Sequence, residues 1–383
     1  MKVRAHARSS SGRRRFAAAL LLALAAGPAG AAGGWLFPAK LAGPVSTLHL
    51  ATGPGRVQAL TGGERWRDMD PDPCPDGRIV FASNRGRPGP VDPRRPVENV
   101  DIFIVRPGAP PRRLAGAAGD DVQPRCAPDG RHVAYVHRGG EREALHLVRL
   151  EDGADSLRLE LERLYDLAWL PDGRGLVLAA RRAGQGVLLR YSLETDSAEP
   201  LYGVPPDAPP AEPAAVSVSP DGQHLAFILH PLYAGGVRKA WILPHDGGAP
   251  RPISPENVQV QAPLTWSPDG RSLLYAAALD YDYEFDEVHH KKTYRGAVNL
   301  YLSPLSGATR CLTVGGLHRS PVFFPDGRRI AFLYADRLDA RTLELRVMNK
   351  DGNDVKPWYD RVAPHALLRW YRYEHKNTSA NLP

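Results

Sequence analysis

Cysteine is scarce in this chain of 383 residues, which contains only Cys74, Cys126 and Cys311. Three cysteines exclude a disulfide scaffold, and their spacing matches no common metal motif. Cys74 and Cys126 each stand just before a Pro-Asp-Gly tripeptide, which leaves a bridge between them open. Small buried thiols are the simpler interpretation, so the sequence does not decide the pairing.

The body of the chain also lacks net charge. The whole chain has a formal charge of +7, but Lys2, Arg4, Arg8 and Arg13–Arg15 place six of its 49 basic residues at the N-terminus. Without these six residues, the chain contains 43 basic and 42 acidic residues. A nearly neutral body is not typical of proteins that bind nucleic acid, and we expect no nucleic-acid partner.

The N-terminal segment follows the three-part layout of a secretory signal peptide. An apolar core over residues 16–26 follows the basic residues, and Ala29–Ala31 offers small residues for cleavage. The uncharged stretch continues far enough that residues 16–37 form the alternative, a membrane anchor. We expect residues 1–32 to be the leader of a periplasmic or secreted protein. Under the alternative, the body is anchored to the membrane but still lies outside the cytoplasm.

A Pro-Asp-Gly tripeptide recurs at intervals of about 50 residues, a period typical of stacked repeat units. Apolar residues alternate with others after each tripeptide, as at Leu273 and Tyr275. Alternation on both sides of a turn predicts a β-hairpin, in which Pro and Gly set the turn and Asp bonds its own backbone. The aspartates to which we assign this structural role are Asp76, Asp129, Asp172, Asp221, Asp269 and Asp326.

Each predicted hairpin is followed by a second pair of strands with its own turn signal, and no long helical pattern occurs. Four antiparallel strands per repeat predict an all-β fold, a β-propeller of four-stranded blades over residues 45–383. The six tripeptides give six blades. Residues 45–63 look like a second strand pair without its first hairpin, and residues 363–375 follow the sixth blade. These end segments can join as a seventh blade, so both counts stay open.

The phrase [WFV]-S-P-D-G-x-x-[LI]-[AL]-[FY], carried by Val218–Phe227 and Trp266–Tyr275, resembles the WD-like Pro-Asp repeat of the TolB-type β-propellers. Repeat matches cover about Asp68–Tyr359. The resemblance implies a propeller that works in the cell envelope by binding protein partners. TolB itself has a smaller α/β domain before its propeller, for which this sequence leaves no room. Membership of the Tol system is therefore not implied.

Long insertions mark one end of the predicted propeller. Blade topology places the Pro-Asp-Gly turns at one end and the insertions 84–101, 202–213 and 279–296 at the other. Function on a rigid scaffold concentrates in such loops, so we expect the binding face at the end opposite the Pro-Asp-Gly turns. The candidate residues of this face are Arg85, Arg87, Arg94, Arg95, Tyr281, Tyr283 and Phe285.

The insertion 279–296 also contains side chains that bind metals. Alternating carboxylates suit Ca²⁺ or another divalent cation, and zinc or iron would also use histidines. The glycine of a typical calcium loop is missing, and the same pattern fits an extended hairpin with tyrosines on one side and carboxylates on the other. The residues of this alternative metal site are Asp280, Asp282, Glu284, Asp286, His289 and His290.

The sequence contains no G-x-S-x-G nucleophile motif. Inner-strand positions, where propeller lactonases and lyases hold their ligands, offer Asp70, Asp72, Arg125, Asp166 and Arg319, without a histidine cluster. We therefore expect a monomeric, non-enzymatic, exported propeller that binds an envelope protein or peptide without a cofactor. The alternative is a metal-dependent lyase or hydrolase that acts on a sugar or a lactone.

Overall fold

The computed structural model describes residues 33–40, 45–85, 99–286 and 291–372, without the side chains of residues 40 and 280–294. The chain divides into two units, Met1–Gly30 and Ala31–Pro383, and all described residues belong to the second. These residues form strands and no helix, which confirms the all-β prediction. Accordingly, no helix within the described ranges is long and apolar enough to cross a membrane.

Four sheets each contain four strands that are consecutive in the chain and antiparallel. The first sheet contains β4 (Asp68–Pro73), β5 (Ile79–Ser83), β6 (Asp101–Val105) and β7 (Arg112–Ala115). The second contains β8 (Asp120–Cys126), β9 (His132–Arg138), β10 (Glu143–Arg149) and β11 (Asp155–Leu161). The third contains β12 (Arg163–Trp169), β13 (Gly175–Arg182), β14 (Gln185–Ser192) and β15 (Ser197–Gly203). The fourth contains β16 (Ala211–Val218), β17 (His224–Pro231), β18 (Lys239–Pro244) and β19 (Arg251–Pro252). We call these sheets blades 1 to 4.

The remaining strands belong to one hydrogen-bonded sheet of twelve strands, in which three groups of four follow one another. Blade 5 contains β20 (Val258–Trp266), β21 (Ser272–Asp286), β22 (Lys291–Pro304) and β23 (Arg310–Cys311). Blade 6 contains β24 (Leu317–Phe323), β25 (Arg329–Ala335), β26 (Leu343–Asn349) and β27 (Lys356–Val362). The last group, which we call the composite blade, contains β28 (Arg369–Arg372), β1 (Gly33–Lys40), β2 (Ser46–Gly53) and β3 (Arg56–Ala59).

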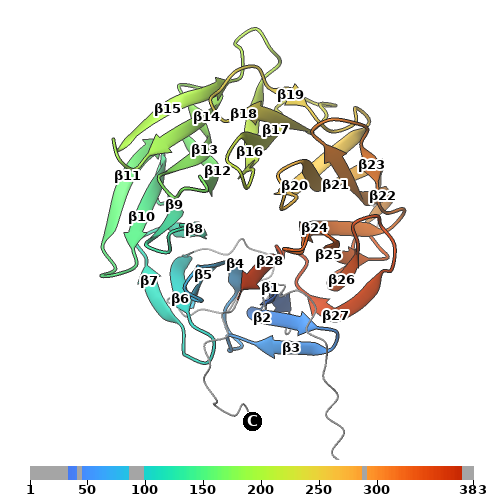
Figure 1. Ribbon diagram of the computed structural model, residues 1–383, viewed down its shortest axis with the longest axis horizontal. Helices are drawn as coiled ribbons and strands as arrows, with labels where there is room; N and C mark the ends of the chain where they lie inside the picture. Colours follow the sequence, from blue (N-terminus) through green and yellow to red (C-terminus); the bar gives the residue numbers. More distant parts are fainter. Residues whose placement is uncertain (1–32, 41–44, 86–98, 287–290, 373–383) are drawn as a thin grey trace, which may run out of the picture. The chain divides into compact units, whose positions relative to one another are not determined.

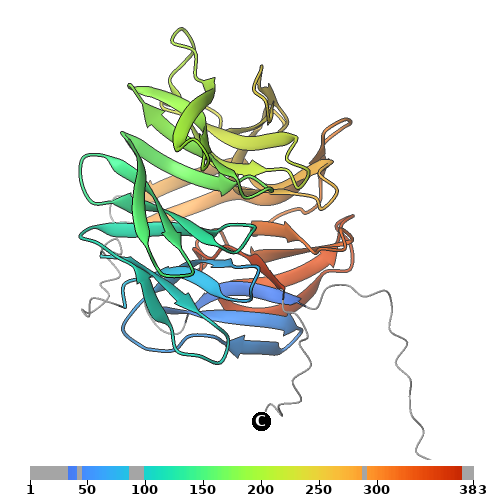
Figure 2. The same ribbon diagram turned by 60° about the vertical axis from the view of Figure 1, so that its left-hand side comes forward.

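The composite blade joins the two ends of the described chain. β1 pairs with β2 on one edge and with β28 on the other, with Trp35 opposite Trp370 and Leu36 opposite Arg369. The blades follow one another around a ring, with β28, β4, β8, β12, β16, β20 and β24 innermost (Figure 1). Figure 2 shows the blue N-terminal strands and the red C-terminal strand side by side where the ring closes.

The six Pro-Asp-Gly turns all have the same local structure. In each turn the Asp carboxylate accepts a hydrogen bond from the backbone N–H two residues later, at 2.8 to 3.1 Å. The glycine of each turn has a positive φ between 65° and 79°, a conformation in which other residues are strained. The bond between the Asp of the tripeptide and the residue that follows its glycine thus stabilises the hairpin between the first and second strands of each of these blades.

Apolar side chains fill the spaces between neighbouring blades. Trp35 of the composite blade is fully buried. Its ring lies edge-on to Phe324, with 4.9 Å between the ring centroids, and to Trp370, with 5.0 Å. These contacts join blade 6 to both chain ends of the composite blade. Residues 35–37, which the sequence analysis included in the alternative membrane anchor, are therefore buried in a propeller strand.

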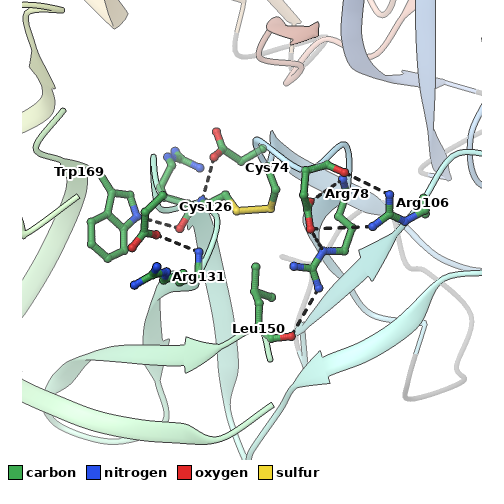
Figure 3. Close-up of a disulfide and its surroundings, with 11 residues drawn as sticks. Cys74, Arg78, Arg106, Cys126, Arg131, Leu150 and Trp169 are labelled. Atoms are coloured by element: carbon green, nitrogen blue, oxygen red, sulfur yellow. Dashed lines mark hydrogen bonds and ion pairs between the residues drawn. A yellow bond between two sulfur atoms is a disulfide. The ribbon is translucent and has the colours of Figure 1, made fainter. Parts of the chain in front are cut away.

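A disulfide joins blades 1 and 2. Cys74 follows the inner strand β4, and Cys126 is the last residue of the inner strand β8. Their Cα atoms are 5.2 Å apart, an ordinary disulfide separation. Close by, Arg78 Nη1 donates a hydrogen bond to Leu150 O of blade 2 at 3.5 Å (Figure 3). The interpretation of the cysteines as small buried thiols is therefore wrong for this pair, because the ring places the two strand ends side by side. Cys311 has a free thiol and is exposed.

Candidate functional site: the axial cavity

Each inner strand of the six Pro-Asp-Gly blades contains a bulge that begins five or six residues before the proline of its tripeptide. Pairing with the second strand shifts register at this point in every case. A bulge changes the direction of a side chain and is common beside functional sites. The residues five positions before the proline are Asp70, Gln123, Asp166, Ala215, Pro263 and Ser320. In blade 3 the pairing skips Tyr165, and Asp166 beside it pairs with Ala179.

Four of these bulge residues have a positive φ although none is glycine. The φ angles are 46° for Asp70, 54° for Gln123, 52° for Ala215 and 47° for Ser320. A non-glycine residue in this region costs about 1 kcal/mol or more, and such residues cluster at functional sites. Because this conformational free energy is spent in four blades, we infer that the bulge in the inner strand is needed for the fold or for its function.

The inner strands surround a cavity of about 880 Å³, which we call the axial cavity. Its wall has two different parts. Charged residues come from β4, β8, β12 and β28, whereas β16 and β20 contribute mostly small or apolar residues, such as Val216 and Leu264. Arg319 of β24 and Arg238, which precedes β18, add two further guanidinium groups. The charged residues of the first part are Asp70, Asp72, Arg125, Asp166 and Arg369.

Two of the charged residues pair with each other. Asp72 Oδ1 lies 3.5 Å from Arg369 Nε, and Asp72 Oδ2 accepts a hydrogen bond from the backbone N–H of Cys126 at 3.0 Å. Burial lowers the pKa of Arg369, and the nearby charge of Arg125 lowers it further. Asp72 therefore links β4 to both neighbouring inner strands, β8 and β28.

Asp70 and Asp166 lack a cationic partner. Within the described residues, no basic nitrogen lies within 4.0 Å of either carboxylate. Asp166 Oδ1 accepts a hydrogen bond from the backbone N–H of Leu167 at 3.0 Å. Burial raises the pKa of Asp166, and the guanidinium of Arg125 opposes this rise. Arg125 itself donates a hydrogen bond to Pro124 O at 2.9 Å. The wall thus contains two carboxylates whose charge is only partly compensated.

Uncharged polar groups complete this part of the wall. Gln123 Nε2 donates to Tyr165 O at 3.1 Å, and Trp169 Nε1 donates to Arg125 O at 3.0 Å. These bonds join blades 2 and 3 beside the cavity. Gln123 Oε1 and Ser217 Oγ are buried and have no hydrogen-bond partner among the described residues. The cavity wall therefore contains polar atoms that the chain itself does not satisfy.

The structure brings together the inner-strand residues that the sequence analysis named. Asp70, Asp72, Arg125, Asp166 and Arg319 all line the axial cavity. Sequence reasoning missed Arg369, because no tripeptide follows the inner strand of the composite blade, and it missed the polar role of Gln123. Alignment of the six repeats on their tripeptides would have revealed Asp, Gln and Asp at one position of three consecutive blades.

The candidate residues of the insertions are only partly described. Arg85 lies against Asp68, to which Arg85 Nε donates at 3.2 Å. The binding-face candidates Arg87, Arg94 and Arg95 and the ligand candidates His289 and His290 lie outside the described residues.

The third insertion continues the hairpin of blade 5. The backbone of β21 and β22 is paired as far as Asp286 opposite Lys291, with Asp282 opposite Arg295 and Tyr283 opposite Tyr294. An extended hairpin is thus observed, and its acidic and aromatic residues occupy alternate positions. The side chains outside the described set are those of Asp280, Tyr281, Asp282, Tyr283, Glu284, Phe285 and Asp286. Elsewhere among described side chains, no group of three His, Cys, Asp or Glu could hold a metal ion.

Comparisons with known proteins identify the fold. A scan of family models and a search of curated proteins find no match. Among solved structures, TolB from Acinetobacter baumannii is 16% identical, with 80% of this chain and 82% of that chain covered and a TM-score of 0.50. The fold is a TolB-like β-propeller.

Two further solved structures have the same fold over almost their full length. A putative 6-phosphogluconolactonase from Bacteroides uniformis is 14% identical, with 88% of this chain and 99% of that chain covered and a TM-score of 0.58. The periplasmic gluconolactonase of Pseudomonas aeruginosa is 17% identical with the same coverage and a TM-score of 0.56. At these identities the likeness shows the TolB-like fold alone.

Proposed function

We propose that this TolB-like propeller is a periplasmic binding protein that takes a segment of a protein partner into the axial cavity. The observation that carries the proposal is the pair of carboxylates, Asp70 and Asp166, without a cationic partner in the wall of a cavity of about 880 Å³. Both residues are half-buried. Partial removal of a charge from water without a partner costs free energy, and a bound segment would offset that cost. The volume lies within the usual range of ligand pockets.

Three observations support a place outside the cytoplasm. The Cys74–Cys126 disulfide is typical of oxidising compartments. The N-terminal sequence has the layout of a signal peptide. TolB and the periplasmic gluconolactonase share the fold. We therefore propose that the propeller acts in the periplasm, next to partners of the cell envelope.

A second candidate function is a lyase or hydrolase that acts on a sugar or lactone. Two of the similar structures are named as lactonases, and the lining of the axial cavity includes carboxylates and the indole of Trp169. Carboxylates can act as general acids or bases, and an aromatic ring can pack against a sugar. The two candidate functions differ in the fate of the ligand: an enzyme would convert it to a product, whereas a binding protein would release it unchanged.

Site-specific cross-linking tests the proposed function. A photo-reactive phenylalanine analogue is placed at Ser217, which lines the axial cavity, or at Gln223, which is exposed at the Pro-Asp-Gly end of the same blade. In envelope extracts we expect the Ser217 variant alone to cross-link a protein partner, and Asp166→Asn to weaken that product. Equal products from both positions would contradict binding in the cavity. Consumption of a lactone or sugar acid that Asp166→Asn abolishes would instead establish the enzyme.

A further inference from the structure

Three neighbouring blades have an oxygen acceptor at the same repeat position, five residues before the proline of the tripeptide. Asp70 belongs to blade 1, Gln123 to blade 2 and Asp166 to blade 3, and all three residues line the axial cavity. The equivalent residues of blades 4, 5 and 6 are Ala215, Pro263 and Ser320, none of which has a carboxylate or an amide. The acceptors are therefore concentrated on one side of the ring.

Few groups of the described chain donate hydrogen bonds to these acceptors. The amide nitrogen of Gln123 donates to Tyr165 O, which fixes the orientation of the amide and leaves Oε1 buried without a donor. Asp166 accepts one backbone N–H, and Asp70 has no hydrogen bond or ion pair within the described chain. The missing groups are therefore N–H donors and positive charge.

The nearest arginines only partly supply that charge. Arg369 lies beside Asp72, and Arg125 donates to Pro124 O. Among the five charged residues from β4, β8, β12 and β28, three carboxylates face two guanidiniums, which leaves one net negative charge on this side of the cavity. The two remaining guanidiniums of the wall belong to other blades: Arg238 precedes β18, and Arg319 lies on β24 and donates to Pro364 O at 3.0 Å.

We propose that the axial cavity binds a basic side chain of the partner, with its ammonium or guanidinium group at Asp70, Gln123 and Asp166. This inference rests on the proposed function and specifies the chemistry of the bound segment. An ammonium has three N–H donors and a guanidinium has five, and neither accepts hydrogen bonds. The small and apolar residues of β16 and β20 provide a surface for the methylene stem of a lysine or arginine.

Binding of short peptides to the full chain tests this inference. The probes are fluorescent peptides Ala-Ser-X-Ser-Ala with blocked ends, in which X is Lys, Arg, norleucine or Glu, and fluorescence anisotropy gives each Kd. Norleucine retains the stem of lysine without its charge. We expect the Lys or Arg peptide to bind at least about tenfold more tightly than the norleucine peptide, a difference of about 1.4 kcal/mol.

Four variants locate the bound charge. We expect Asp70→Asn and Asp166→Asn each to weaken the Lys or Arg peptide about tenfold. Asn tolerates the positive φ of residue 70 better than most residues, so Asp70→Asn preserves the backbone, and thermal unfolding checks both variants. Asp207→Asn removes an exposed carboxylate outside the cavity wall and should leave Kd unchanged. Arg319→Gln removes a positive charge from the wall and should tighten binding of the Lys or Arg peptide.

Several outcomes would overturn the inference. One is tighter binding of the Glu peptide that Arg319→Gln weakens, which would show an anionic guest. Another is a Kd that does not depend on X. A third is stoichiometric binding of Ca²⁺ to EDTA-treated protein that Asp70→Asn abolishes, without binding of any peptide. If no peptide binds up to about 1 mM while Ser217 still cross-links a partner, the basic guest is wrong and the proposed function stands.

Discussion

Arg85 closes over the buried carboxylate of Asp68, and three aromatic rings surround its guanidinium. Asp68 is fully buried and also accepts hydrogen bonds from Thr61 Oγ1 at 2.6 Å and Ser83 Oγ at 2.7 Å. The Arg85 guanidinium lies 4.9 Å from the ring centroid of Trp66. Thr61 follows the strands of the composite blade, so this network joins that blade to blade 1. The contacts give Arg85 a structural role, and its role on the binding face stays a prediction.

Arg85→Met is expected to lower the free energy of unfolding by about 3 kcal/mol, because removing one partner of a buried ion pair leaves an uncompensated charge. Urea unfolding at pH 7 measures the change. Arg337→Met is the control, because Arg337 pairs with Asp339 at the surface and should give no measurable change. If Arg85→Met were as stable as the wild type but failed to bind the partner, Arg85 would belong to the binding face instead.

His318 makes the stability of blade 6 depend on pH. Its ring is buried, Nδ1 lies 2.9 Å from Val298 O, and burial lowers its pKa to about 4. The unfolded chain binds a proton near the ordinary pKa of about 6.5, so protonation favours unfolding. This contribution to stability is complete above about pH 6.5 and is lost as the pH falls towards 4.

We expect the wild type to lose about 2.5 kcal/mol more stability between pH 7 and 4.5 than His318→Gln loses. Urea unfolding at both pH values measures this difference. His230→Gln, which replaces an exposed histidine, should keep the pH dependence of the wild type. Parallel pH profiles for the wild type and His318→Gln would show that His318 is not the group responsible.

The disulfide between blades 1 and 2 should contribute substantially to stability. It closes a loop with a sequence separation of 52 residues, for which restriction of the unfolded chain predicts about 3 to 4 kcal/mol. The variant with both Cys74→Ala and Cys126→Ala should therefore unfold at lower urea concentration, whereas Cys311→Ala should not. Alkylation of the denatured, non-reduced protein should label one cysteine, and labelling of three would contradict the bridge.

Tyr371 connects the composite blade to blade 1. The side chain is buried against residues such as Leu36 and Phe81, and its hydroxyl donates to Gly77 O at 2.9 Å. Tyr371→Phe removes only the hydroxyl and should cost about 1 kcal/mol. Tyr371→Ala also leaves a cavity and should cost about 3 to 5 kcal/mol. Thermal or urea unfolding compares the two, and equal losses would mean that the ring does not pack as described.

The blade fold was predictable because its strongest signals are local. The Asp of each tripeptide bonds a backbone group two residues away, as Asp269 does with Arg271, and the alternating strands lie directly beside the turn. The composite blade depends on pairing between distant segments. Trp35 and Phe37 fit an apolar leader as well as a buried strand, and the pairing of β1 with β2 and with the strand around Trp370 distinguishes the two.

The candidate site was predictable in its residues but not in its arrangement. Inner-strand position suggested Asp70 and Asp166, because inner strands face the axis. The bulge that directs them depends on strand pairing that no single repeat reveals. The approach of Arg369 to Asp72 depends on ring closure, as does the contact between Cys74 and Cys126.

The composite blade also sets an order of events for a newly made chain. β1 emerges early, yet one of its edges has no partner until β27 and β28 have been synthesised, and the bond from Tyr371 to Gly77 joins residues 294 positions apart. Contacts between such distant residues form late, because a long loop must first close. The early strands therefore keep an unpaired, hydrogen-bonding edge until the ring closes, and such an edge is prone to aggregation.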